Sequence, residues 1–218
     1  MSFFRFVICC VLLGTHATVA WAEATIEGTV ALPKPKAETA APPRYEIKLA
    51  GEVAPPPAPV AVVYLEGNFS SATSTNATVS AKVVQERFQF SPAVLPVRTG
   101  TVIEFPNLDD SYHNVFSYSK PKRFDLGRYR KDEKPAAVVF DKAGVVKLYC
   151  EIHPHMRATI LVLDTPYFTK TDTNGNFRLE HLPVGKFTLK AWLDEKTQLE
   201  RAVDLSDGAT LRVDFASK

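Results

Sequence analysis

Residues 145–156 read Val-Val-Lys-Leu-Tyr-Cys-Glu-Ile-His-Pro-His-Met. The first half is apolar and rich in β-branched and aromatic residues, a composition typical of a buried strand. The second half is more polar and holds Cys150, His153 and Met156 at intervals of three residues. A second apolar segment begins soon after Met156, so the pattern predicts a short loop between two strands.

This loop presents donor atoms that suit a transition metal. A thiolate, an imidazole and a thioether are soft or borderline ligands, and a second imidazole would complete the His₂Cys set with axial methionine of copper electron-transfer sites. Zinc sites use cysteine, histidine and carboxylates rather than methionine. The competing interpretation is that Cys150 and Met156 are ordinary core residues and the histidines lie at the surface. Four rare residues within seven positions favour the metal site.

The second imidazole has to come from elsewhere in the chain, and His113 is the best candidate. It lies in the segment 105–115, at a predicted turn-to-strand junction from which a neighbouring strand would bring it to the loop. His155 is two residues from His153, so its side chain is expected to point away and to lie at the rim of the site. His181 belongs to a different segment and is expected at the surface.

Residues 1–22 predict a secretory signal peptide. Arg5 supplies the positive start, residues 6–14 are apolar, and a small-x-small motif ends at Ala22. The apolar run is far shorter than the roughly 20 residues of a membrane-spanning helix. We therefore expect cleavage after Ala22, no stable membrane span, and export to the periplasm.

Cleavage would leave Cys150 as the only cysteine and Met156 as the only methionine of the mature chain. A single thiol cannot form an internal disulfide, and in an oxidising compartment it is open to oxidation. Cys150 therefore needs another explanation, and a metal site provides one.

The composition is that of a globular protein, with 45% of the 218 residues hydrophobic and 23% charged. Lys and Arg exceed Asp and Glu by only 26 to 24, so we expect no nucleic-acid partner. Short segments rich in Val, Ile, Phe, Tyr and Thr alternate with Gly, Pro, Asn and Asp, which indicates an all-β chain. Half of the 16 prolines lie between residues 33 and 59, which predicts an extended excursion. Strands are expected at residues 25–31, 60–65, 81–90, 101–104, 115–118, 136–140, 145–150, 157–164, 167–171, 176–179, 186–193 and 209–215, with a weak one at 45–49.

Two further segments have both a structural and a functional interpretation. Residues 120–134 carry seven Lys or Arg against three Asp or Glu, which fits a solvated loop or a docking patch for an acidic partner. Residues 172–176, Asp-Thr-Asn-Gly-Asn, resemble the start of a calcium loop. The Asn-Gly pair between two strand patterns favours a hairpin instead, and the other acidic ligands of a calcium loop are missing.

The pattern Cys150-x-x-His153-x-x-Met156 with an upstream His113-Asn114 resembles the cupredoxins, the small blue-copper proteins. The proline after the loop histidine is similar to the amicyanin type. The resemblance implies that His113, Cys150 and His153 are equatorial copper ligands and that Met156 is the axial one. It also implies that Asn114 ties the ligand loops together by hydrogen bonds, an arrangement that tunes metal sites.

One position departs from the cupredoxin pattern. Many cupredoxins place Ser or Thr directly after the cysteine, where it receives the hydrogen bond from the asparagine, whereas this chain has Glu151. We therefore expect a different tie between the ligand loops, and a carboxylate at this position would lower the copper potential.

A wider resemblance covers nearly the whole chain after residue 22. Residues 105–107, 122–124, 150–153 and 168–172 look like segments of exported proteobacterial proteins labelled methylamine-utilisation or plastocyanin-like. Residues 182–189 are similar to carboxypeptidase-regulatory-like β-sandwich modules.

Together these resemblances imply an all-β chain with two units. A Greek-key cupredoxin sandwich at residues 81–164 would be inserted into a second, small β-sandwich module. Residues 23–80, which include the proline-rich excursion, and residues 165–218 would supply the N- and C-terminal strands of that module.

The implied function is that of a one-electron carrier with one copper ion, whose partner is a periplasmic cytochrome or dehydrogenase. The alternative is a copper-binding or delivery protein without redox turnover, in which His155 beside Met156 helps to hand on the ion. An enzyme is disfavoured, because multicopper oxidases and copper nitrite reductases need further histidine sets. A four-ligand site also leaves no open position for a substrate.

Overall fold

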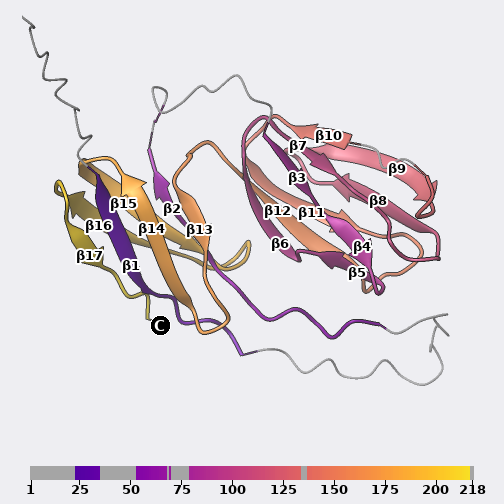
Figure 1. Cartoon of the computed structure of the whole chain (residues 1–218), viewed down its shortest axis with the longest axis horizontal. Helices are drawn as coiled ribbons and strands as arrows, with labels where there is room; N and C mark the ends of the chain where they lie inside the picture. The colour runs from indigo at the N-terminus through magenta and orange to yellow at the C-terminus, as the bar shows by residue number, and fades with distance from the viewer. Residues whose placement is uncertain (1–22, 35–52, 68, 70–78, 134–136, 217–218) are drawn as a thin grey trace, which may run out of the picture.

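The computed structural model describes residues 23–34, 53–67, 69, 79–133 and 137–216 (Figure 1). The predicted signal peptide, the weak strand at 45–49 and much of the proline-rich excursion lie outside the described residues. Within the described ranges, no helix is long and apolar enough to cross a membrane.

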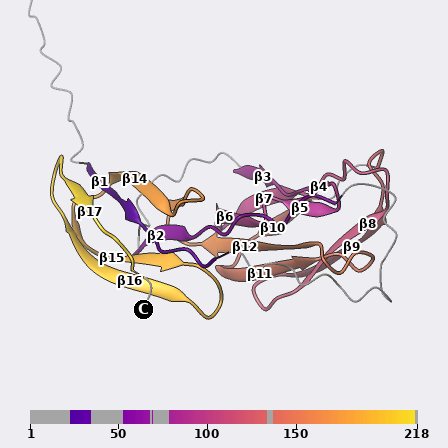
Figure 2. The ribbon, with the colours of Figure 1, turned by 90° about the horizontal axis from the view of Figure 1, so that it is seen from below.

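The described strands form two units that lie side by side along the long axis of the molecule (Figures 1 and 2). The unit formed by the middle part of the sequence is here called the central unit, and the other the flanking unit. The central unit contains a five-stranded sheet in the order β6-β12-β11-β8-β9, a three-stranded sheet in the order β10-β7-β3, and the hairpin β4-β5. Its strands are β3 (Ser80–Lys82), β4 (Val84–Glu86), β5 (Gln89–Ser91), β6 (Val94–Arg98), β7 (Thr101–Glu104), β8 (His113–Tyr118), β9 (Arg123–Tyr129), β10 (Ala137–Phe140), β11 (Gly144–Tyr149) and β12 (Arg157–Leu163).

The flanking unit is built from both ends of the chain. One sheet has the order β14-β1-β17 and the other β13-β2-β15-β16, so strands that precede the central unit pair with strands that follow it. Its strands are β1 (Ala24–Thr29), β2 (Val62–Glu66), β13 (Phe168–Lys170), β14 (Asn176–Leu182), β15 (Gly185–Trp192), β16 (Gln198–Leu205) and β17 (Thr210–Arg212). The predicted all-β fold class, with a second unit made of N- and C-terminal strands, is confirmed by this pairing.

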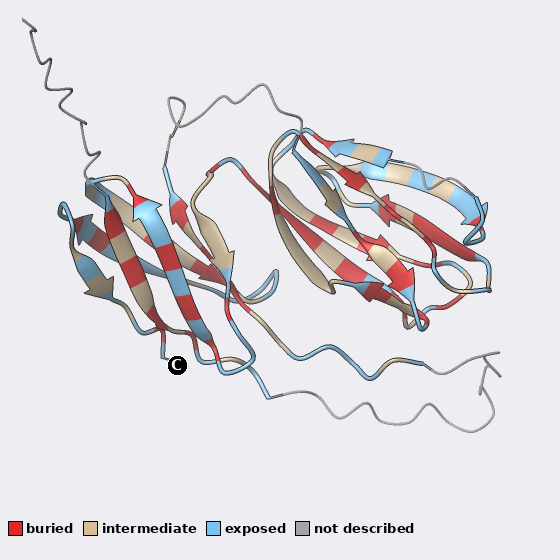
Figure 3. Ribbon diagram, viewed as in Figure 1, coloured by how far each residue is buried: buried red, intermediate tan, exposed pale blue. Residues whose placement is uncertain are grey.

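Each unit buries its own apolar core because alternate residues along a strand point to opposite faces. Figure 3 shows this alternation of buried and exposed positions in both units. Strand β1 alternates between buried and half-buried residues along its whole length. In the central unit Phe105, Phe140, Leu148 and Ile160 are buried almost completely, and Cys150 and Met156 belong to the same core.

A smaller apolar cluster joins the two units. Trp192 and Val62 of the flanking unit pack with Leu161 and Leu163 of β12. Strand β12 can contact both units because its two faces are apolar, and every residue from Ala158 to its end is buried or half-buried. The end of β12 is followed after a short turn by β13, so the chain passes directly from one unit to the other.

The predicted strand at 81–90 is wrong in one respect: the structure divides this segment into β3, β4 and β5. A hairpin turn at Arg87 and Phe88 reverses the chain between β4 and β5. Neither residue is the glycine or asparagine that usually marks such a turn, so the sequence carried no signal for it. Three of the described strands were not predicted at all, because Pro96 interrupts β6 and charged residues dominate the exposed faces of β9 and β16.

The hairpin expected at residues 172–176 is present between β13 and β14. Asp172 Oδ1 accepts hydrogen bonds from the backbone N–H groups of Asn174 (2.9 Å) and Asn176 (2.8 Å). Its Oδ2 accepts a further hydrogen bond from Asn176 Nδ2 at 2.8 Å. The carboxylate therefore closes the turn itself.

Candidate metal centre

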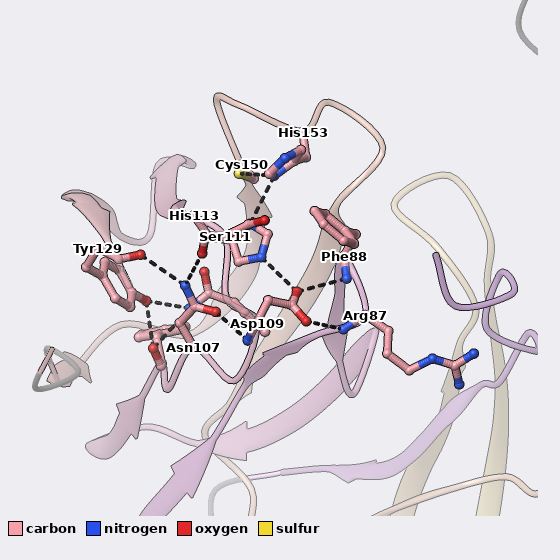
Figure 4. Close-up of polar contacts among 11 residues, drawn as sticks. Arg87, Phe88, Asn107, Asp109, Ser111, His113, Tyr129, Cys150 and His153 are labelled. Atoms are coloured by element: carbon pink, nitrogen blue, oxygen red, sulfur yellow. Dashed lines mark hydrogen bonds and ion pairs between the residues drawn. The ribbon is translucent and has the colours of Figure 1, made fainter. Parts of the chain in front are cut away.

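Two strand ends and one loop bring His113, Cys150 and His153 together at one end of the central unit (Figure 4). His113 is the first residue of β8, Cys150 directly follows β11, and His153 lies in the loop that leads to β12. All three side chains are buried, and their ligand atoms lie within 4.8 Å of one another. The two Nδ1 atoms are 2.9 Å apart, and Cys150 Sγ lies 3.8 Å from His153 Nδ1.

Met156, the predicted axial ligand, lies at the end of the same loop. Its side chain is fully buried in the core that also contains Cys150. Its backbone N–H donates a hydrogen bond to the carbonyl of His153 at 2.9 Å, which closes a turn between the two residues. Its role as a ligand stays a prediction.

The other two histidines are placed differently. His155 is half-buried, and its ring centroid lies 6.1 Å from that of His153. Its Nε2 atom is enclosed and has no hydrogen-bond partner among the described residues. His181 is exposed in the flanking unit, where its Nδ1 lies 2.6 Å from Glu23 Oε2.

Asn114 links the strand of His113 to the loop of Cys150. Its side chain is buried, its Oδ1 accepts a hydrogen bond from the backbone N–H of Glu151 at 3.2 Å, and its Nδ2 donates to Asp125 Oδ1 at 2.7 Å. The link uses the backbone of residue 151, so it does not need a hydroxyl side chain there. The Glu151 carboxylate lies in an exposed ion pair with Arg128 at 3.2 Å.

Asp109 is a polar partner of the site that sequence reasoning missed. Its Oδ2 lies 2.8 Å from His113 Nε2 and accepts a hydrogen bond from the backbone N–H of Phe88 at 2.9 Å. Its Oδ1 accepts from the backbone N–H of Arg87 at 2.7 Å. The sequence signal was only an acidic residue four positions before His113, in a segment interpreted as a turn.

The surroundings of the three side chains shift their pKa values. Burial raises the pKa of the Cys150 thiol, but hydrogen bonds from His113 and from backbone N–H groups, including that of Asn114, outweigh burial and lower it below its ordinary value. Burial lowers the pKa of His113, but contacts with Cys150 and Asp109 outweigh it and raise that pKa. Burial, followed by the charges of neighbouring histidines, lowers the pKa of His153 to about 4. A thiolate and a neutral imidazole are the forms that bind metals.

The spacing of the donors fits a single ion. A metal about 2.1 Å from nitrogen and about 2.3 Å from sulfur, with the trigonal angle of about 120°, separates nitrogen and sulfur by about 3.8 Å. The distance between Cys150 Sγ and His153 Nδ1 is 3.8 Å. The two imidazole nitrogens are closer, at 2.9 Å, because they are hydrogen-bonded to each other, and an ion between them would move them apart. Two imidazoles and a thiolate are the equatorial donors of blue-copper sites.

Comparison with known families finds one match within the chain. The model described as carboxypeptidase regulatory-like domain matches residues 151–218. That range contains β12 of the central unit and β13 to β17 of the flanking unit. It does not contain β1 or β2, which complete the two sheets of the flanking unit. No curated protein matches the chain.

Several solved structures resemble part of the chain. A copper-containing nitrite reductase from Thermus scotoductus SA-01 is 26% identical over 41% of this chain, with a TM-score of 0.37, and the match spans only 23% of the reductase. A purple cupredoxin from Nitrosopumilus maritimus is 24% identical over 38% of this chain and 99% of its own length, with a TM-score of 0.34. The Cu(I) form of an amicyanin mutant is 17% identical over 46% of this chain and 98% of its own length, with a TM-score of 0.35.

Proposed function

We propose that this protein is a mononuclear blue-copper protein of the periplasm that carries single electrons. The observation that supports this best is the convergence of the His113, Cys150 and His153 ligand atoms within 4.8 Å in a buried site. Copper, when bound, would supply a couple that changes by one electron.

The residues of the chain would hold the ion in one geometry for both oxidation states. The ligands come from strand ends and from a short loop closed by its own hydrogen bond, so little rearrangement accompanies a change of charge. The apolar core around Cys150 and the Phe88 ring beside both imidazoles would keep water from the ion. Met156 would be the weak axial ligand, and Asn114 would keep the ligand loops together.

The proposed partner is an acidic periplasmic protein such as a cytochrome or a dehydrogenase. The basic run 120–134 includes β9, an edge strand of the five-stranded sheet. Arg128 and Arg130 are the sequence neighbours of Tyr129, which pairs with His113 at the start of β8. Charges of one sign steer a partner of the other sign and raise its association rate. The loop with His153 would be the exit for the electron.

A second candidate function is copper binding and delivery without redox turnover. His155 favours it: its enclosed Nε2 has no partner among the described residues, and its ring centroid lies 6.1 Å from that of His153. A further donor close to the site would help to hand on a Cu(I) ion. A reversible potential with fast self-exchange would support the carrier, whereas rapid transfer of Cu(I) to an apo-acceptor would support delivery. We propose no enzymatic activity, and steady turnover of oxygen or nitrite by the purified protein would contradict this.

The absorption spectrum of the protein loaded with one equivalent of Cu(II) tests the proposal. We expect a strong thiolate-to-copper band in the red part of the spectrum and its complete loss in Cys150→Ser. His181→Ala is the matched control, since that histidine is exposed in the flanking unit, and it should leave the band unchanged. Absence of the band in the wild type, or its survival in Cys150→Ser, would refute a blue-copper site.

A further inference from the structure

We propose that Asp109 is a positioning residue that fixes which nitrogen of His113 faces the metal, and that the β4-β5 turn holds Asp109 in place. The inference rests on the proposed metal site, and it concerns residues of this chain that are not themselves ligands. The carboxylate lies on the far side of the His113 ring from Cys150 and His153 (Figure 4).

Asp109 receives three hydrogen bonds from groups in different parts of the fold. His113 Nε2 lies 2.8 Å from Oδ2, and the backbone N–H groups of Arg87 and Phe88 donate to Oδ1 and Oδ2 at 2.7 and 2.9 Å. The carboxylate is only 13% exposed. Three donors around a mostly buried carboxylate leave it little freedom, so the His113 ring is held in one orientation.

The loop that carries Asp109 is also tied down. The backbone N–H of Asp109 donates a hydrogen bond to Asn107 Oδ1 at 2.9 Å. Asn107 is buried, and its Nδ2 donates to the carbonyls of Ser111 at 2.9 Å and Tyr129 at 3.0 Å. The loop before His113 therefore cannot move independently of β9, which pairs with β8 at His113.

The turn that donates to Asp109 has an unusual backbone. Arg87 and Phe88 have φ angles of 52° and 57°, a left-handed region that residues with a β-carbon seldom adopt in succession. Strained backbone persists where the surroundings over-determine it and is concentrated at functional sites. Here Asp109 accepts both N–H groups of the turn, and the carbonyl of Arg87 accepts a hydrogen bond from Ala54 at 2.9 Å.

The same turn also places an aromatic ring against the site. The Phe88 ring lies edge-on to the imidazoles of His113 and His153, with centroid distances of 5.6 and 5.1 Å. One hairpin tip thus contributes two backbone donors to Asp109 and one apolar ring to both histidines. This double use explains why a strained turn occupies this position.

The consequence concerns the choice of ligand atom. With Nε2–H donated to Asp109, the nitrogen that faces Cys150 and His153 is Nδ1. A carboxylate that accepts the other N–H of a metal-bound histidine sets the tautomer, orients the ring and makes the ligand more basic. Without Asp109 the ring could turn and present either nitrogen, so fewer molecules would have a complete site.

The test compares Asp109→Asn and Asp109→Ala with Asp110→Asn in the full chain. Asp110 is the neighbouring acid, is largely exposed, and pairs with Lys131 instead of His113, so its variant removes the same charge without touching the site. The probes are Zn(II), whose complex is diamagnetic, and Cu(II). The readouts are the dissociation constant for each ion, the proton NMR signal of His113 Nε2–H in the Zn(II) protein, and the reduction potential of the copper protein.

We expect a 10- to 100-fold weaker affinity for both ions in Asp109→Ala, in line with losses of partners that orient metal-bound histidines. Asp109→Asn keeps one acceptor oxygen and should lie between Asp109→Ala and the wild type. In the wild type the Nε2–H signal should exchange slowly with solvent and lie far downfield, and in Asp109→Ala it should exchange rapidly. Loss of the negative charge should also raise the potential, while Asp110→Asn behaves like the wild type.

The outcomes separate this inference from the proposed function. Equal affinities and equal Nε2–H exchange in the Asp109 and Asp110 variants would overturn the role of Asp109 even if the blue band is present. A wild type without the blue band would refute the proposed function, while the Zn(II) and NMR measurements would still decide the role of Asp109. If Asp109→Ala does not fold, Asp109→Asn and rescue by Asp109→Glu supply the same comparison.

Discussion

The central and flanking units are both β structures over apolar cores, but they differ in what else they bury. Among the residues that the structure describes, and apart from Thr165 in the turn between β12 and β13, the flanking unit buries one polar residue, Thr171. The central unit buries Gln85, Thr101, Asn107, His113, Asn114, Ser117 and His153. Buried polar groups cost free energy unless they are paired, so the meeting of His113, Asn114 and His153 at one end of the central unit indicates a function beyond folding.

Exposed ion pairs, in contrast, occur in both units. In the central unit, for example, Lys82 pairs with Glu104 at 3.1 Å. In the flanking unit Arg178 pairs with Glu27 and Glu180 at 2.6 and 2.7 Å, and all three side chains are at least 38% exposed. Exposed pairs of this kind contribute about 0–1 kcal/mol. The two units therefore differ in the polar side chains that they bury rather than in their surface ion pairs.

The largest expected effect is stabilisation by metal, and it should be confined to the central unit. Binding to the folded state alone stabilises it by about 4 kcal/mol when the free ion is a thousandfold above its Kd. Hydrogen exchange should slow in β8, β11 and the loop 150–156 on addition of Zn(II), with little change in β1 and β14. His113→Ala should abolish the slowing, and equal protection of both units would contradict the comparison.

The second effect is a loss of stability in the flanking unit that leaves the candidate metal centre unchanged. A β-carbon on Gly28 would lie 1.8 Å from the carbonyl oxygen of Val213, which directly follows β17. Gly28→Ala therefore has to move the backbone at Val213 away from β1. We expect a loss of about 3 kcal/mol in the free energy of unfolding, measured by urea denaturation, because an overpacked position cannot relax against backbone. Glu27→Ala, which removes only the exposed pair with Arg178, should cost less than about 1 kcal/mol.

The copper affinity of Gly28→Ala tests whether the metal centre depends on the flanking unit. Below the onset of unfolding, the variant should bind copper within about a factor of two of the wild type, because the contacts of Gly28 lie in the flanking unit. A large loss of affinity would show that the flanking unit maintains the metal centre.

The smallest effect is a pair of pH dependences with opposite signs in the metal-free protein. The pKa of His153 is lowered to about 4 by burial and nearby histidines. The unfolded chain, with an ordinary histidine pKa near ~6.5, therefore binds the proton first, and stability falls as the pH drops from about 6.5 to about 4. We expect a loss of about 1–2 kcal/mol, less than the full shift implies, because the raised pKa of the neighbouring His113 contributes the opposite pH dependence.

His181 should show the reverse dependence. The hydrogen bond with Glu23, and then its charge, raise the pKa of this exposed histidine. Its contribution is present below the unfolded pKa and is lost as the pH rises through the folded one. Unfolding curves of His153→Gln and His181→Gln between pH 4 and pH 8 check both signs, and an unchanged slope in His153→Gln would contradict the assignment.

The candidate ligands of loop 150–156 were predictable because they are neighbours in the chain. Cys150, His153 and Met156 lie within seven residues, so a short turn brings them together whatever the rest of the fold does. His113 was predictable only as a candidate, because few histidines compete with it after residue 22. Its approach to Cys150 depends on the pairing of β8 with β11, which the sequence pattern did not specify.

Asp109 and the β4-β5 turn could not be predicted for the same reason. The contacts of Asp109 with Arg87 and Phe88 cross more than twenty residues of chain. Arg87-Phe88 contains no glycine, asparagine or aspartate, the residues typical of a two-residue turn. A carboxylate in a loop usually points to solvent. Only the packed fold shows that this carboxylate faces a histidine.

Local patterns in the amino-acid sequence were sufficient to establish the all-β class and the identities and spacing of the loop donors. Alternation of side chains within a strand and the reach of a few residues of backbone are short-range properties that any window of the chain displays. Only the tertiary structure showed three further features. His113 lies close to Cys150, Asp109 supports the His113 ring, and β1 and β2 pair with C-terminal strands. Sheet register and loop packing depend on contacts between distant residues, whose free energy is gained only when the whole unit folds.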